Sequence, residues 1–168
     1  MFVILHNIRS LHNVGSIFRT ADAAGVEKIY LCGFTPTPVD AFGRPRTQLT
    51  KVSLAAEKYV EWEYCKSSAR LIAQLKKEGY KIFAIEQSKK SIPYYLVKCP
   101  AKSEARRRRQ KSNVGCKKVV LVLGGEIKGL PPSILSRAER ILEIPMRGKK
   151  ESLNVSVAFG IIAFNLIN

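Results

Sequence analysis

The sequence predicts an α/β protein with an open, mainly parallel sheet and helices on both faces. Short apolar runs without clean alternation are typical of parallel strands that are covered on both sides. Segments with helical spacing lie between these runs, and this alternation is typical of sheets wound by right-handed crossovers. With 168 residues, of which 46% are hydrophobic, the chain is long enough to bury a substantial core. We therefore expect a single domain over residues 1–168.

Five runs have the composition of buried strands. Each is short and bulky, and we expect strands at residues 2–5, 28–32, 81–85, 119–123 and 140–144. Four helical segments lie between or after them. The first is predicted over residues 14–24, with Asn13 as its N-cap and Gly25 at its end. The second is predicted over residues 68–78, a short one follows Pro131 and Pro132, and the last covers residues 153–166.

Two long segments show neither pattern. Residues 34–50 contain three prolines, and residues 89–118 contain a strongly basic run. Irregular segments of this length in a compact domain are usually functional or disordered. The formal net charge is +16, and residues 98–118 supply nine Lys or Arg against one acid, a net of +8. Such an excess favours a polyanionic partner, although a solvated surface loop is the alternative for this segment.

Several classes of protein are not expected from the composition. The four cysteines form no CxxC pair and lie at no metal-ligand spacing with either histidine, so we expect reduced thiols and no metal. No signal peptide is expected, and the longest apolar stretch, residues 155–167, is shorter than the roughly 20 residues that span a bilayer. We expect a soluble, cytoplasmic protein with no membrane association.

Three polar clusters follow predicted strands, where ligands bind in open α/β sheets. They are residues 13–22 (NVGSIFRTAD), 123–130 (LGGEIKGL) and 144–158 (IPMRGKKESLNVSVA). Together and in this order, they resemble the three motifs of the SpoU/TrmH family of RNA 2′-O-ribose methyltransferases, in the SPOUT superfamily. The resemblance covers nearly the whole chain and implies the SPOUT fold, with a deep trefoil knot in the C-terminal third. One position departs from the family, which commonly has Asn where this chain has Gly125.

The resemblance implies S-adenosylmethionine as cofactor and assigns site residues. The cofactor would be held by Leu123, Gly124, Gly125, Ile144, Met146, Leu153 and Asn154. Catalytic roles fall to Arg19, Asn13, Glu126, Ser152 and Asn154. Because a guanidinium stays protonated in proteins, we expect Arg19 to grip phosphate and stabilise developing alkoxide charge rather than act as a base. Glu126 is expected to accept hydrogen bonds from Arg19 or from the RNA ribose, while capping explains Ser152 and Asn154 equally well.

Eight arginine and lysine residues are candidates for contact with tRNA or rRNA. We expect phosphate contacts from Arg9, Arg44, Arg46, Lys51, Arg106, Arg107, Arg108 and Arg109, without a separate RNA-binding domain.

The family also implies a homodimer. The last helix has almost no polar face and suits a dimer interface; burial in its own core is the competing explanation. Two other functions stay open. One is a SPOUT enzyme that methylates a base nitrogen, and the other is a non-catalytic RNA-binding module.

Overall fold

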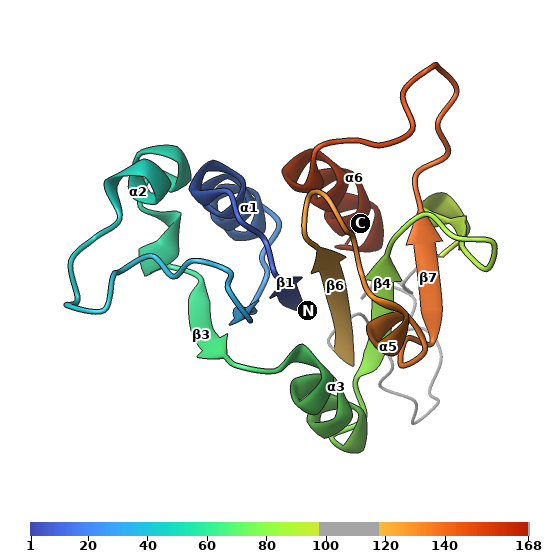
Figure 1. Ribbon diagram of the computed structural model, residues 1–168, viewed down its shortest axis with the longest axis horizontal. Coiled ribbons are helices and arrows are strands. Elements are labelled where there is room, and N and C mark those ends of the chain that lie inside the picture. The colour runs from blue at the N-terminus through green and yellow to red at the C-terminus, as the bar shows by residue number, and fades with distance from the viewer. Residues whose placement is uncertain (98–117, 168) are drawn as a thin grey trace, which may run out of the picture.

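A computed structural model describes residues 1–97 and 118–167, and it has a seven-stranded sheet in this part of the chain (Figure 1). The strand order is β3-β2-β1-β6-β4-β7-β5. Every strand pair in the described sheet is parallel, which confirms the predicted class. The strands are β1 (Phe2–His6), β2 (Lys28–Cys32), β3 (Glu61–Cys65), β4 (Lys81–Ile85), β5 (Ile92–Pro93), β6 (Val119–Gly124) and β7 (Arg140–Glu143).

Helices cover both faces of the sheet, as predicted (Figure 1). One face carries α1 (Leu11–Ala23), α2 (Thr47–Ser53) and α6 (Val155–Ile167). The other carries α3 (Ser68–Lys77) and α5 (Pro132–Leu135). Two short 3₁₀ segments, η1 (Ala56–Lys58) and η2 (Tyr94–Leu96), lie in the connections.

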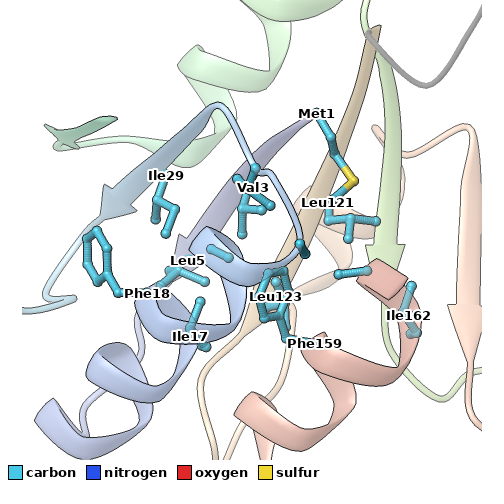
Figure 2. Packing of buried hydrophobic residues seen from close by; sticks show 14 of the residues in the cluster. Met1, Val3, Leu5, Ile17, Phe18, Ile29, Leu121, Leu123, Phe159 and Ile162 are labelled. Atoms are coloured by element: carbon cyan, nitrogen blue, oxygen red, sulfur yellow. The ribbon is translucent and has the colours of Figure 1, made fainter. Parts of the chain in front are cut away.

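The larger part of the core lies between the sheet and the pair α1 and α6. Figure 2 shows these buried side chains gathered in one cluster, and alternate residues of β1 and β6 supply the sheet side of it. The labelled members from these elements are Val3, Leu5, Ile17, Phe18, Leu121, Leu123, Phe159 and Ile162. The intervening residues of the same strands, Ile4, Val120 and Val122, pack in a second cluster with α3 and α5. Burial on both faces explains why these strands are continuously apolar.

Strand β6 lies in the middle of the sheet, between β1 and β4. The chain first builds β1, β2 and β3 in one direction and then places β4 beyond the position that β6 later fills. The direction of strand order therefore changes beside β1, and such a switch point is where α/β sheets bind ligands. Within the described residues, no helix is long and apolar enough to cross a membrane.

Strands β3 and β5 and helix α2 were not predicted, and all three lack a continuous apolar run. Strand β3 has the sequence EWEYC and lies at the sheet edge, where its glutamates reach solvent and pair with Lys28. Strand β5 has only two residues. The segment 34–50, predicted to be irregular, contains the start of α2 and a bridge between Val39 and Pro45.

The boundaries of two helices also differ from prediction. Helix α1 begins at Leu11 with Ser10 as its N-cap, so the assignment of Asn13 as the cap was wrong. Both residue types are good caps, and the sequence around them does not show which one the chain uses. Helix α6 begins at Val155 rather than at Leu153.

Candidate functional site

Loops that follow the carboxyl ends of β1, β6 and β7 form the candidate site. They are residues 7–10 before α1, residues 125–129 after β6, and residues 144–154 between β7 and α6. Figure 1 shows the third loop leaving the arrowhead end of β7 and returning to α6. Because β1 and β6 are neighbours in a parallel sheet, the polar residues of the first two loops meet at one edge.

The carboxylate of Glu126 joins the first two loops. Its Oε2 accepts a hydrogen bond from the backbone N–H of Arg9 at 3.0 Å. Its Oε1 accepts from the backbone N–H of Ser10 at 3.1 Å and from Nδ2 of Asn13 at 2.9 Å. The predicted site residues Glu126 and Asn13 are therefore in direct contact.

These hydrogen bonds complete the start of α1. The Ser10 hydroxyl accepts from the backbone N–H of Asn13 at 3.2 Å, which is one half of a capping box. In a complete capping box, a Glu or Gln side chain at the third helical position also accepts from the backbone N–H of the cap residue. Here the third helical residue is Asn13, and the first turn of α1 contains no acid. Glu126 supplies the missing carboxylate from a different loop. The sequence around α1 alone contains no signal for this arrangement.

The ionisation of Glu126 reflects the same contacts. Partial burial alone would raise the pKa of Glu126, but hydrogen bonds from the Arg9 N–H, the Asn13 amide and the Ser10 N–H outweigh it. The pKa is therefore held below its ordinary value of 4.5. The resulting negative charge lies at the N-terminus of α1, where the helix dipole stabilises it.

Asn154 joins the third loop to the same group. Its Nδ2 donates to Oδ1 of Asn13 at 3.0 Å, so that Glu126, Asn13 and Asn154 form a continuous hydrogen-bonded chain. The Oδ1 of Asn154 accepts from the backbone N–H of Ser156 at 2.8 Å and from its hydroxyl at 2.7 Å, which caps α6. Ser152 is exposed and forms no hydrogen bond with any residue that the structure describes.

The loop after β6 is closed at its base by glycines. The N–H of Gly129 donates to the carbonyl of Gly125 at 2.9 Å. Gly129 has φ of 58° and packs against the carboxylate of Glu86, which accepts from the N–H of Leu130 at 2.8 Å. Glu86 follows β4 and holds this loop, although the sequence analysis did not identify it. Its position directly after a predicted strand, at the ligand-binding edge, was the signal available.

Gly125, where the family commonly has Asn, lies against the chain after β1. A Cβ at this position would lie 2.5 Å from the backbone oxygen of Asn7, closer than real Cβ atoms approach. Asn7 itself has φ of 58°. The chain at Asn7 can therefore come this close only because residue 125 is a glycine.

Arg19 lies on α1 six residues beyond Asn13, about 9 Å along the helix axis. Its side chain is exposed and forms no hydrogen bond or ion pair with residues 1–97 or 118–167. The expected contact from Arg19 to Glu126 is not formed, since the Glu126 oxygens accept from Arg9, Ser10 and Asn13 instead. A guanidinium without a counterion among the described residues is available to a ligand oxyanion.

The residues expected to hold the cofactor lie at the same edge. The side chain of Leu123 is buried in the core, so only its backbone can reach a ligand. Ile144 and Met146 are half-buried, and Leu153 is 41% exposed. These three side chains lie on the one loop that follows β7, and the backbone of Gly124 and Gly125 follows β6 at the same edge of the sheet. Accessible apolar side chains at this edge fit the apolar faces of S-adenosylmethionine.

Basic residues expected to contact RNA lie on the loop after β1, in the connection between β2 and α2, and on α2. Arg9, Arg44 and Lys51 are exposed. Arg46 is half-buried, and its Nε is buried without a partner among the described residues. Arg106, Arg107, Arg108 and Arg109 lie outside the described residues.

The described part of the chain contains no group of three His, Cys, Asp or Glu side chains arranged to hold a metal ion. Cys32 and Cys65 are free thiols, and burial raises the pKa of both. The fold and site thus define an α/β protein with a ligand site at the carboxyl edge of its sheet.

The chain belongs to the SpoU rRNA Methylase family, whose model matches residues 1–164. It is 30% identical over 164 residues to the tRNA (guanosine(18)-2′-O)-methyltransferase of Aquifex aeolicus, covering 98% of this chain and 67% of the relative. It is 28% identical over 167 residues to the 23S rRNA (guanosine-2′-O-)-methyltransferase RlmB of Xanthomonas axonopodis pv. citri, covering 99% of this chain and 58% of the relative.

A solved structure supports the same relationship. The AdoMet-bound rRNA methyltransferase of Sinorhizobium meliloti matches with a TM-score of 0.78 and 26% identity, over 98% of this chain and 54% of that chain. The chain therefore spans little more than half the length of several relatives. The similarity covers all three loops of the candidate site.

We expect Gly125→Asn to destabilise the protein, although Asn is the family's usual residue. The new Cβ must displace the Asn7 carbonyl, and overpacking of this kind costs about 1–3 kcal/mol. Urea unfolding measures the loss. Gly148→Asn is the matched control, because nothing lies within 4 Å of a Cβ there. Equal stability of the two variants would contradict the close approach to Asn7.

We expect Glu126→Gln to be less stable than the wild type near neutral pH, because an amide NH₂ would face N–H donors. Because the pKa is lowered in the folded protein, ionised Glu126 stabilises the fold above about pH 4.5. This stabilisation is lost as the pH falls through the lowered pKa of the folded state. The difference in unfolding temperature should therefore be constant from about pH 7 to about pH 5 and shrink as the pH falls below 4.5 towards the lowered folded pKa. Thermal unfolding followed by circular dichroism tests this, with the exposed Glu151→Gln as control. A difference that is constant with pH would refute it.

Proposed function

We propose that the protein transfers a methyl group from S-adenosylmethionine to a ribose 2′-hydroxyl of tRNA or rRNA. The observation that carries this proposal is the hydrogen-bonded chain of Glu126, Asn13 and Asn154, which joins the three motif loops. Family membership supports it, as do the printed functions of the Aquifex and Xanthomonas relatives. The cytoplasmic location expected from the sequence is part of the same proposal.

The cofactor would lie between the loops after β6 and β7. Backbone groups of Leu123, Gly124 and Gly125 would bind its polar edges, and Ile144, Met146 and Leu153 would pack on its apolar faces. When bound, S-adenosylmethionine supplies a methyl group on a sulfonium, which is already a strong electrophile. The protein then has to position the ribose hydroxyl and stabilise the charge that develops on it.

Arg19 would supply that stabilisation. Its guanidinium stays protonated and has no counterion among the described residues, so it is available to a phosphate and to the developing alkoxide. Glu126 is a positioning residue, because both of its oxygens already accept hydrogen bonds and its pKa is lowered. We therefore assign the hydroxyl proton to solvent water rather than to Glu126. Ser152 and Asn154 would orient the loop or the nucleotide.

The resemblance-based expectations of a knot and a dimer belong to the same proposal. The knot rests on membership of the family. Helix α6 supports the dimer. Phe159, Ile162 and Leu166 are buried in the chain's own core, whereas Val157, Phe164 and Ile167 on the same helix are exposed. Core packing thus accounts for only one side of α6.

We expect Arg19→Ala to lower methyl transfer by about 10²–10³-fold, as the loss of one charge-stabilising donor does in other enzymes. The measurement is transfer of tritiated methyl from S-adenosylmethionine to total tRNA and rRNA. Label that survives alkali in a 2′-O-methyl dinucleotide identifies the ribose as acceptor. The matched control is Arg70→Ala, which removes an exposed arginine from α3 on the opposite face of the sheet.

Other outcomes of this assay would select the alternatives. Label on a base nitrogen would indicate a base methyltransferase with the same fold and cofactor. Absence of both transfer and cofactor binding would indicate a non-catalytic RNA-binding module. Full activity of Arg19→Ala would remove Arg19 from the mechanism.

We expect Phe164→Asp to convert a dimer into a monomer, because a charge would enter the apolar face of α6 that the core leaves exposed. Sedimentation velocity measures the change in mass. Tyr59→Asp is the control, since Tyr59 is also an exposed aromatic residue but precedes the amino end of β3. A wild type that sediments as a monomer, or a Phe164→Asp variant that remains dimeric, would exclude this interface.

A further inference from the structure

Two exposed phenylalanines, each paired with an arginine, lie in the connection between β2 and α2. Phe34 is 56% exposed, and Cζ of Arg9 lies 5.5 Å from the centroid of its ring. Phe42 is 83% exposed, and Cζ of Arg44 lies 5.7 Å from its centroid. Neither ring has a part in the fold's core or in the proposed methyl transfer.

The first pair is held next to Glu126. The backbone N–H of Phe34 donates to Oδ1 of Asn7 at 3.3 Å. The next residue, Thr35, is buried, and its hydroxyl bonds to the chain at Leu5, Ile8 and Cys32. On the other side of the pair, the N–H of Arg9 donates to Glu126. The backbone of both partners is therefore fixed, that of Arg9 by Glu126 and that of Phe34 by Asn7 and Thr35.

The second pair is held in a built turn in the loop that joins β2 to α2 (Figure 1). The Asp40 carboxylate accepts from the N–H of Phe42 at 2.8 Å and from the N–H of Arg44 at 2.9 Å. A bridge between Val39 and Pro45 closes the turn. Both donors bind Oδ1 of Asp40, and Arg44 forms no ion pair with a residue that the structure describes, so its charge is available to a ligand.

We propose that these two pairs form a stacking ledge for unpaired nucleotides of the RNA. The partner is an RNA because Arg9 and Arg44 lie over the two rings, and Arg46 and Lys51 follow further along the same stretch of chain, in a protein of net charge +16. It is single-stranded at this point because bases in a duplex cover each other's faces, whereas unpaired bases stack on aromatic rings and guanidinium planes. The proposal rests on the proposed function for its substrate and adds which part of an RNA the site accepts.

Binding to a short oligoribonucleotide of mixed sequence, single-stranded or in a duplex, tests the ledge by fluorescence anisotropy. We expect tighter binding to the single strand, and a loss of about fivefold or more in affinity for it from Phe34→Leu or Phe42→Leu. Phe34→Tyr and Phe42→Tyr should retain the affinity, because the aromatic face remains. The control is Tyr59→Leu, which removes an exposed ring just before the amino end of β3.

Two further readouts separate stacking from charge and from folding. The salt slope of log Kd should be unchanged in the Leu variants and should fall by about 0.7 in Arg44→Gln, because only the latter loses a phosphate contact. A 2-aminopurine in the single strand should be quenched by the wild type and less so by Phe34→Leu. Thermal unfolding confirms that the variants are folded.

The outcomes distinguish this proposal from the function on which it rests. Equal affinity for strand and duplex, or Leu variants that bind as the wild type does, would overturn the ledge even if methyl transfer is intact, and would leave these rings to a protein partner. No binding to either RNA, together with no methyl transfer, would overturn the proposed function itself.

Discussion

The site depends on the carboxylate of Glu126. It binds the two N–H groups at the start of α1 and the amide of Asn13, and Asn13 in turn orients Asn154 at the start of α6. The start of one helix is thus completed by a residue of another loop, and the start of a second helix is linked to it. One charged group, held in its ionised form by these donors, sets the relative positions of three loops.

Close backbone packing adds a second constraint on the same loops. Gly125 lies against the carbonyl of Asn7, and Gly129 lies against the carboxylate of Glu86. The loop after β6 is therefore held on one side by the chain after β1 and on the other by the chain after β4. Residues at these positions are coupled, since a side chain at Gly125 requires a different path at Asn7. This coupling gives a physical reason for the departure from the family's usual asparagine.

The sequence predicted those parts of the fold that carry a continuous apolar run. Strands β1, β2, β4, β6 and β7 were found, whereas β3, with two glutamates, resembles a solvated segment until its place at the sheet edge is known. The three motif loops were also found, because polar clusters follow three predicted strands and together resemble the motifs of the family. Their mutual contacts were not, since Arg9 and Glu126 lie 117 residues apart and meet only because β1 and β6 pair. The role of Glu86 depends in the same way on the pairing of β4 with β6.

The central place of β6 has a consequence for how the chain folds. During synthesis, β1 to β4 emerge before the strand that must lie between β1 and β4. Until residues 119–124 arrive, the inner edges of β1 and β4 present unpaired backbone groups, and such edges favour pairing with other chains. Contacts between distant segments also form slowly, because loop closure precedes the gain from packing. Completion of the sheet and assembly of the site are therefore one late event, and a chain interrupted before β6 has neither.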